Sequence, residues 1–301
     1  MLAFPFKNRT AIAIASAMVG AVLFSSKGIL IKFAYRYPVD ALGLMGIRMA
    51  IALPFYLLIY QFYVRKHHPV ALTGTSKLII SSLGLLGYLA ASYLDFLGLH
   101  WISASLERIL LYLYPTFVLA IGWLFLKKSA TGTQMVALAF TYLGIVVLFY
   151  PEVQSTQKNL LLGAGLVTAS ALAFALFMLG SERCIRTYGS VRFTSLAMIA
   201  ASMGVMLGAG LFSKTDFVHL PSQVYGIGFL LALFCTIIPT YLVAFGVGIL
   251  GASTSSILSG VGPVSAILMA QAWLGESLLP EQWIGVLLVL VGVTALGGKK
   301  R

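Results

Sequence analysis

The chain has 301 residues, of which 60% are hydrophobic and only 9% are charged, and its formal net charge is +12. A soluble globular domain carries roughly 25% charged residues. Eight acidic and twenty basic side chains are too few to cover a water-soluble protein of this length, and the bases are spread along the chain rather than gathered in a patch for nucleic acid. The composition predicts an all-helical integral membrane protein and excludes a soluble enzyme.

Ten apolar segments follow one another, separated by polar or Gly/Pro-containing breaks. A membrane-spanning helix needs about 20 mostly apolar residues, so ten of them leave only short connections and no room for a soluble catalytic domain. The predicted spans cover approximately residues 10–34, 40–63, 78–99, 103–126, 131–150, 160–181, 192–213, 222–247, 251–274 and 282–298. The connections after residues 99 and 247 are so short that the helices they join are expected to be antiparallel neighbours.

The Lys and Arg residues of the short loops predict the orientation, because such loops are richer in basic residues on the cytoplasmic side. With the N-terminus inside, thirteen of the twenty bases fall on the cytoplasmic side and four outside. The thirteen are Lys7, Arg9, Arg65, Lys66, Lys77, Lys127, Lys128, Arg183, Arg186, Arg192, Lys299, Lys300 and Arg301. We therefore expect a multi-pass protein of the inner (plasma) membrane with both termini in the cytoplasm.

The two halves of the chain resemble each other. A shift of 148 residues aligns 98–148 with 246–296 without a gap and places Pro115 on Pro263 and Tyr93 on Tyr241. The predicted units are residues 1–150 and 151–301, with five spans each. Because five is odd, the two units must have opposite orientations in the membrane, which is the inverted-repeat architecture of many secondary transporters, with the substrate site at the repeat interface.

At this level the chain resembles the EamA-type members of the drug/metabolite transporter superfamily over essentially its whole length. The resemblance rests on a basic residue ending the first span and an Arg inside the second, on a small-residue start with a proline in the fourth and ninth spans, and on Leu-Gly-Glu after the ninth. These residues are Lys32, Arg48, Ser103–Ser105, Pro115, Ala252, Ser253, Pro263 and Leu274–Glu276. The first half departs from the pattern, with Lys127-Lys128 where Gly-Glu is usual. The resemblance implies ten helices, a central cavity and transport of a small molecule, without specifying which.

Five ionisable residues are predicted inside the spans: Lys27, Arg48, Asp95, Glu107 and Arg108. A charged side chain at the bilayer centre costs about 2.5–3.5 kcal/mol on insertion scales, so such residues face a cavity or one another. All five belong to the first half and are expected in the outer half of the membrane.

Two interpretations of these charges stay open. They are structural ion pairs, Asp95 with Arg108 and Glu107 with Lys27 or Arg48, or they form an outer gate or a relay for substrate and protons. In the second case the excess of one positive charge suits a carboxylate, free or in a zwitterion, and Asp95 is the expected proton carrier.

Several uncharged residues inside the spans are further candidates for the transport path. Tyrosines within spans, unlike those at the interfaces, have rings and hydroxyls suited to a small organic solute, and small residues on the ninth span allow close approach of a substrate or of another helix. The candidates are Tyr88, Ser92, Tyr93, Tyr112, Tyr241, Ser255 and Ser259. Pro115 and Pro263 are the predicted hinges, since proline interrupts helical hydrogen bonding; the alternative is that they only shape the bundle.

The sequence contains no HExxH, Gly-x-Ser-Gly, Gly-x-Gly-Asp or Walker motif, so we expect no enzyme activity, no cofactor and no metal site. The prediction is a secondary transporter that moves a small polar or amphipathic metabolite, an amino acid or organic anion being favoured, by alternating access. Proton coupling and export are the favoured mode. The alternatives are an exchanger or drug exporter without proton coupling, or, further off, a membrane receptor, scaffold or enzyme. The expected partners are the small-molecule substrate, the lipid bilayer and protons. The sequence is also compatible with a homodimer.

The orientation is testable directly. A green fluorescent protein fused to the C-terminus is expected to fluoresce, and alkaline phosphatase fused there to be inactive, because only the first folds in the cytoplasm and only the second requires export. The reverse pattern would place the termini outside and contradict the loop-charge argument.

Overall fold

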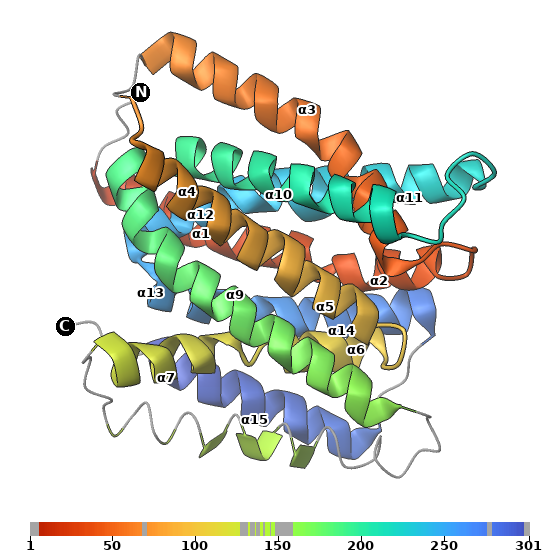
Figure 1. Ribbon diagram of the computed structural model, residues 1–301. Helices are drawn as coiled ribbons and strands as arrows, with labels where there is room; N and C mark the ends of the chain where they lie inside the picture. Colours follow the sequence, from red (N-terminus) through yellow and green to blue (C-terminus); the bar gives the residue numbers. More distant parts are fainter. Residues whose placement is uncertain are drawn as a thin grey trace.

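The computed structural model describes residues 6–67, 71–126, 159–275 and 279–297, with isolated positions between 132 and 147. All the regular elements within these ranges are helical (Figure 1). The predicted span 131–150, Lys127, Lys128 and Glu276 lie outside the described residues, except for isolated positions of the span.

Eight helical stretches in the described ranges are long and apolar enough to cross a membrane, and a shorter apolar stretch covers Pro280–Gly292. They are built from α1 (Phe6–Ser25) with α2 (Lys27–Ala34), α3 (Ala41–His67), α4 (Gly74–Gly84) with η1 (Leu85–Ala90) and α5 (Ala91–Gly98), α6 (Ala104–Leu111) with α7 (Tyr114–Leu126), α9 (Leu160–Tyr188), α10 (Ser190–Phe212), α11 (Ser222–Ala232) with η2 (Leu233–Ile237) and α12 (Ile238–Leu250), α13 (Ala252–Leu258) with α14 (Val261–Leu274), and α15 (Pro280–Gly297). Large apolar side chains remain exposed along these helices, as expected for a surface that faces lipid.

The end of α9 differs from the prediction. The helix continues to Tyr188, beyond the predicted end at residue 181, and Gly189, with φ of 84°, makes the sharp connection to α10. A span predicted from hydropathy ends at the first charged residues, whereas the helix itself continues until a residue such as glycine ends it. Arg192, predicted as the first residue of the next span and counted among the cytoplasmic bases, lies in the first turn of α10, only 6% exposed, with its guanidinium 6.0 Å from the centre of the Tyr188 ring.

Several of the spanning stretches are interrupted, and the interruptions recur in the two halves. The π-helical turns η1 and η2 begin at Leu85 and Leu233, which are 148 residues apart. The gap between α6 and α7 and the gap between α13 and α14 fall just before Pro115 and Pro263. Each proline is thus placed in the first turn of a helix, where its missing N–H removes no intrahelical hydrogen bond.

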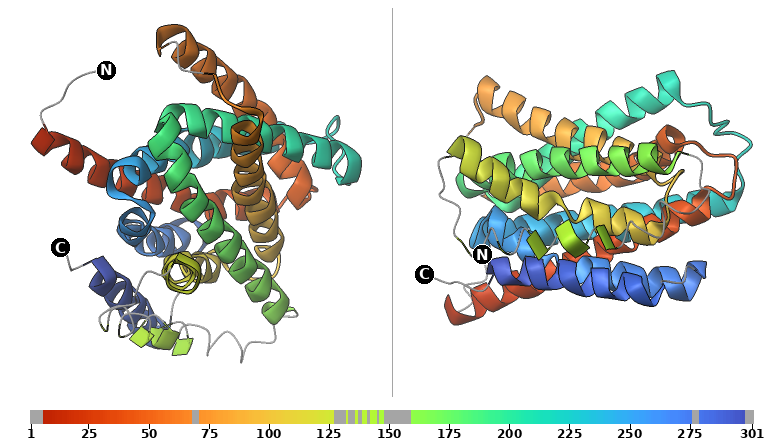
Figure 2. Two further views of the ribbon diagram at one scale, coloured as in Figure 1. Left: turned by 60° about the vertical axis from the view of Figure 1, so that its left-hand side comes forward. Right: turned by 90° about the horizontal axis from the view of Figure 1, so that it is seen from below.

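The packing also repeats. α1 packs against α12 as α9 packs against α5, α3 packs against α11 as α10 packs against α4, and α1 packs against α14 as α9 packs against α7. α3 and α10 pack against each other. Figure 2 shows the helices gathered around the centre of the bundle, and in Figure 1 α1 begins at the same end of the bundle at which α15 finishes. We call this the terminal end.

At the opposite end Asp40 links two connections. Its carboxylate accepts hydrogen bonds from the N–H groups of Gly43 (2.6 Å) and Lys214 (2.7 Å) and from the hydroxyls of Ser213 (2.7 Å) and Thr215 (3.0 Å). Partial burial alone would raise the pKa of Asp40, but these donors hold it below its ordinary value. The carboxylate thereby joins the start of α3 to the connection between α10 and α11.

Close contact between α4 and α10 depends on Gly84. A Cβ at this position would lie 2.1 Å from the carbonyl oxygen of Ala197, so Gly84→Ala forces two backbones apart, and such overpacking costs about 1–3 kcal/mol. We expect a lower midpoint of thermal unfolding in detergent. Gly165→Ala on α9, where a Cβ meets nothing within 4 Å, is the control and should be neutral or slightly stabilising. Equal midpoints for the two variants would contradict the contact.

Candidate functional site

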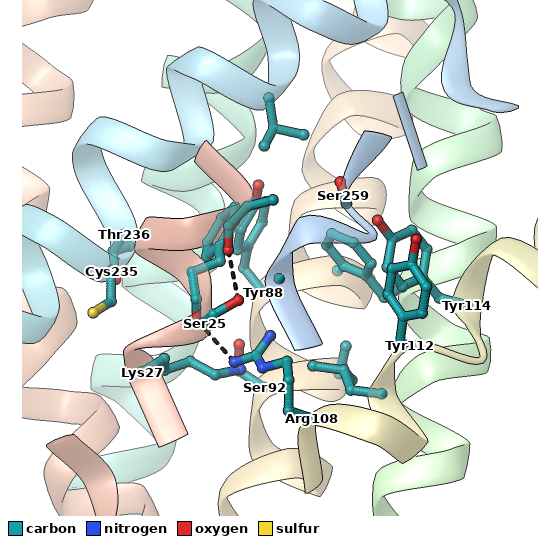
Figure 3. Close-up of a pocket in the computed structure, with 18 of the residues that line it drawn as sticks. Ser25, Lys27, Tyr88, Ser92, Arg108, Tyr112, Tyr114, Cys235, Thr236 and Ser259 are labelled. Carbon is teal, nitrogen blue, oxygen red and sulfur yellow. Dashed lines mark hydrogen bonds between the residues drawn. The ribbon is translucent and has the colours of Figure 1, made fainter. Parts of the chain in front are cut away.

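A cavity with an empty volume of about 820 Å³, its open side included, lies between the two halves of the chain. Its wall consists of residues from eleven described elements and their connections: Ala21, Phe24, Ser25, Lys27, Arg48, Gly87, Tyr88, Ala91, Ser92, Arg108, Leu111, Tyr112, Tyr114, Phe174, Cys235, Thr236, Val243, Ser259, Gly262 and Pro263. Figure 3 shows Lys27 and Arg108 approaching one end of the cavity from opposite sides, with Tyr112 and Tyr114 along one wall and Cys235 and Thr236 along the other.

The interruptions of the helices all contribute to this wall. Tyr88 belongs to η1, Cys235 and Thr236 to η2, and Tyr112 and Ser259 to the two gaps before the prolines. A π-helical turn leaves the regular i→i−4 ladder, and within this one the Thr236 hydroxyl donates to the carbonyl of Leu231 (2.8 Å). Such turns often occur at functional sites.

One end of the cavity is charged. Lys27, at the start of α2, forms an ion pair and hydrogen bond with Oδ2 of Asp95 on α5. Arg108 on α6 donates from Nη2 to the carbonyl oxygen of Phe24 (2.8 Å), and its Nε lies 3.7 Å from Oε2 of Glu107. Asp95 and Glu107 are both fully buried, whereas Lys27 and Arg108 reach the cavity wall.

This pairing corrects the expected one, in which Asp95 paired with Arg108 and Glu107 with Lys27 or Arg48. Successive residues of a helix point about 100° apart, so Glu107 and Arg108 diverge: Arg108 turns toward the cavity and α1, and Glu107 turns toward α2. Gly28 makes room for the Glu107 carboxyl, because a Cβ at residue 28 would lie 3.0 Å from Oε2 of Glu107. Lys27, one residue earlier, is then the cation beside Asp95.

Arg48 on α3 is held differently. It is 2% exposed, it contributes to the cavity wall, and its guanidinium carbon lies 4.9 Å from the centre of the Phe96 ring. Within the described part of the chain neither its Nε nor its Nη2 has a hydrogen-bond partner. A buried guanidinium with free donors beside a cavity can accept a planar, bidentate anion.

Of the other predicted site residues, Tyr88, Ser92, Tyr112, Ser259 and Pro263 lie on the cavity wall. Three do not. The Tyr241 hydroxyl is hydrogen-bonded to that of Ser195 (2.7 Å), Tyr93 packs at the edge of the hydrophobic core, and Ser255 is buried with its Oγ facing the backbone of Gly246 on α12. Pro115 follows the wall residue Tyr114 without contributing to the wall itself.

Sequence reasoning missed part of the wall. Phe24, Ser25, Phe174, Cys235 and Thr236 were not among the candidates, although Cys235 and Thr236 are the counterparts of Gly87 and Tyr88 at the 148-residue shift. The internal repeat was thus the available signal, since Leu111 and Ser259, and Tyr114 and Gly262, are related in the same way. A smaller apolar cavity, with an empty volume of about 290 Å³, adjoins the first at Tyr88 and Val243.

The Lys27–Asp95 pair gives a stability prediction. Lys27→Met leaves a buried carboxylate without its hydrogen-bonded cation, and breaking a buried pair in this way costs about 3–5 kcal/mol. We expect a clear fall in the thermal unfolding midpoint in detergent. Lys27→Met/Asp95→Asn removes both charges and should recover much of the loss. If the losses of the two single variants, Lys27→Met and Asp95→Asn, add up to the loss of the double variant, the pair contributes no coupling energy.

Comparisons with known proteins agree with this architecture. The family model of the EamA-like transporter family matches residues 11–150 and 161–297, which is one match in each half of the chain. The uncharacterized transporter YcbK of Bacillus subtilis is 28% identical over 284 residues, covering 92% of this chain and 90% of YcbK. An uncharacterized transporter of Archaeoglobus fulgidus is 25% identical over 223 residues, covering 71% of this chain and 75% of the relative.

A solved crystal structure superposes with a TM-score of 0.69 and 14% sequence identity, covering 94% of this chain and 95% of the other, and so shares the fold. Each half matches the family separately, the cavity lies between the halves, and the proteins of this family are transporters, not enzymes. The chain is a multi-pass membrane protein that belongs to the EamA-like transporter family.

Proposed function

We propose that this protein is a proton-coupled secondary carrier of small organic carboxylates, free or in zwitterions, built from ten helices as two inverted five-helix repeats at 1–150 and 151–301. The repeated positions of η1 and η2 and of the two gaps before prolines support this architecture. So does the packing, because three pairs of packed helices in the described part of the chain map onto three others when the halves are exchanged. In such carriers the substrate lies at the repeat interface and the halves rock around it. Pro115 and Pro263 are the proposed hinges, and the location is the inner membrane with cytoplasmic termini.

One observation carries the choice of substrate. Arg48 is buried on the cavity wall, and no described residue accepts a hydrogen bond from its Nε or Nη2. Burying a guanidinium without partners is costly, and a substrate carboxylate would supply them. Lys27 already holds Asp95, so Arg48 and Arg108 are the cations best placed to bind an anion.

The remainder of the wall suits an apolar or amphipathic body. Phe24, Tyr88, Tyr112, Tyr114 and Phe174 surround the cavity with aromatic rings, and the Tyr114 and Phe174 rings meet edge-on with centroids 5.2 Å apart. Small-molecule sites typically combine an apolar lining with a few convergent polar groups. A carboxylate with a hydrocarbon or aromatic portion satisfies both parts of this wall.

The test is transport in proteoliposomes of a labelled pool of amino acids and organic acids, with and without an imposed pH gradient. Protein-dependent flux that rises with the gradient is the expected result. Arg48→Gln should reduce it by about 10- to 100-fold, the equivalent of losing a charge-assisted hydrogen bond worth about 1.5–3 kcal/mol.

Arg36→Gln is the matched control, because the Arg36 guanidinium also lies over a ring, that of Phe33 at 4.7 Å, but the side chain is exposed. Arg48→Lys keeps the positive charge and is the second variant, in case Arg48→Gln does not fold. Wild-type flux that Arg48→Gln leaves unchanged would contradict the carboxylate site, and no flux for any member of the pool would contradict the proposed function.

A further inference from the structure

The charged cluster contains two buried carboxyl groups, those of Asp95 and Glu107, with oxygens that lack a hydrogen-bond donor among the described residues. Lys27 pairs with Asp95, and the adjacent Gly28 leaves room for the Glu107 carboxyl, because a Cβ at residue 28 would lie 3.0 Å from its Oε2, so the two carboxyls are neighbours. Oδ1 of Asp95 and both oxygens of Glu107 have no hydrogen-bond partner among the other described side chains and backbone groups. Buried oxygens of this kind are rare in native proteins and require an explanation.

A single proton shared between the two carboxyls explains these oxygens without partners. Two carboxylates offer each other only lone pairs, whereas a protonated carboxyl donates to its neighbour, and adjacent carboxyls commonly share one proton for this reason. Asp95 is ionised beside Lys27, whose ammonium holds Oδ2. Glu107 has only the loose contact with Nε of Arg108, at 3.7 Å, and is therefore the carboxyl that carries the proton.

We propose that Glu107, rather than Asp95, binds and releases the coupling proton, and that Arg108 links this proton to the substrate. The inference rests on the proposed function. Arg108 reaches the cavity wall and lies beside Glu107. A substrate carboxylate in the cavity draws the guanidinium toward itself and leaves Glu107 protonated against Asp95. When the substrate leaves, Arg108 turns to Glu107 and stabilises the carboxylate that remains after the proton has gone.

The surroundings of Glu107 contain few other groups that could take this role. Its charged neighbours are Lys27 on α2, Asp95 on α5 and Arg108 on α6. α9 and α14 also pack on α6. α14 has no titratable side chain, and those of α9 are confined to its last two turns, from Glu182 to Tyr188, toward the terminal end.

The direction of coupling follows from charge. An anion and a proton that each favour the binding of the other are carried together, because linkage is reciprocal. A proton gradient directed into the cell then drives the anion inward, in contrast to the export expected from the sequence.

The first experiment needs no substrate. Infrared spectra of the wild-type protein at neutral pH should contain the carbonyl band of a protonated carboxylic acid. The band should be lost in Glu107→Gln and kept in Glu281→Gln, a control at the exposed start of α15. It should change frequency in Asp95→Asn, which alters the acceptor. A wild-type spectrum without this band, or a band that Glu107→Gln retains, would overturn the proposal whatever the transport assay shows.

The second experiment measures binding and transport of labelled phenylpropionate, a carboxylate with an aromatic body. In the wild type its Kd should rise by up to about tenfold per pH unit once Glu107 loses its proton. In Glu107→Gln the Kd should be independent of pH, exchange across the membrane should persist, and accumulation under a pH gradient should be lost. Binding that depends on pH equally in both proteins would refute the role of Glu107 alone. Absence of binding to the wild type, with no flux of the amino and organic acid pool, would refute the proposed function itself.

Discussion

The fold depends on the requirement that backbone polar groups in a membrane be satisfied within the protein. Irregular backbone at membrane depth is tolerated only where it is buried or lines a cavity. In the described part of this chain the π-helical turns η1 and η2 and the gaps before Pro115 and Pro263 all supply residues to one cavity, and the break between α1 and α2 is flanked by the wall residues Ser25 and Lys27. The continuous helices α3, α9 and α10 hold these irregular segments in place around it.

Symmetry of the backbone is combined with asymmetry of charge. At the 148-residue shift Glu107 and Arg108 correspond to Ser255 and Ser256, and Asp95 corresponds to Val243. Ser255 therefore packs against α12, whereas Glu107 reaches Asp95. The two halves share one way of shaping a cavity, but among the described wall residues the charged side chains Lys27, Arg48 and Arg108 all belong to the first half.

Hydropathy predicted the eight membrane-spanning stretches that the structure describes, because hydropathy is a property of each segment. The predicted end of α9 at residue 181 was wrong, since the true end is set by a glycine conformation and not by the first charged residue, and the burial of Arg192 was not predicted. The ion pairs were also wrong, because they depend on how far each helix is rotated. The gap between Leu111 and Tyr114 changes that rotation, which brings Tyr114 onto the same wall as Tyr112 although the two do not share a face of a regular helix.

The choice between the two buried carboxyls shows what side-chain geometry adds to sequence. From position alone Asp95 and Glu107 are similar, because Asp95 lies one turn before the end of α5 and Glu107 one turn after the start of α6. Gly28 distinguishes them: its missing side chain admits the Glu107 carboxyl to a site where the adjacent Lys27 is already engaged by Asp95. One carboxyl then has a permanent cation and the other only Arg108, which also faces the cavity. A carboxyl with a permanent cation is a poor proton carrier, while one whose cation can be drawn away by an anion is suited to couple the two.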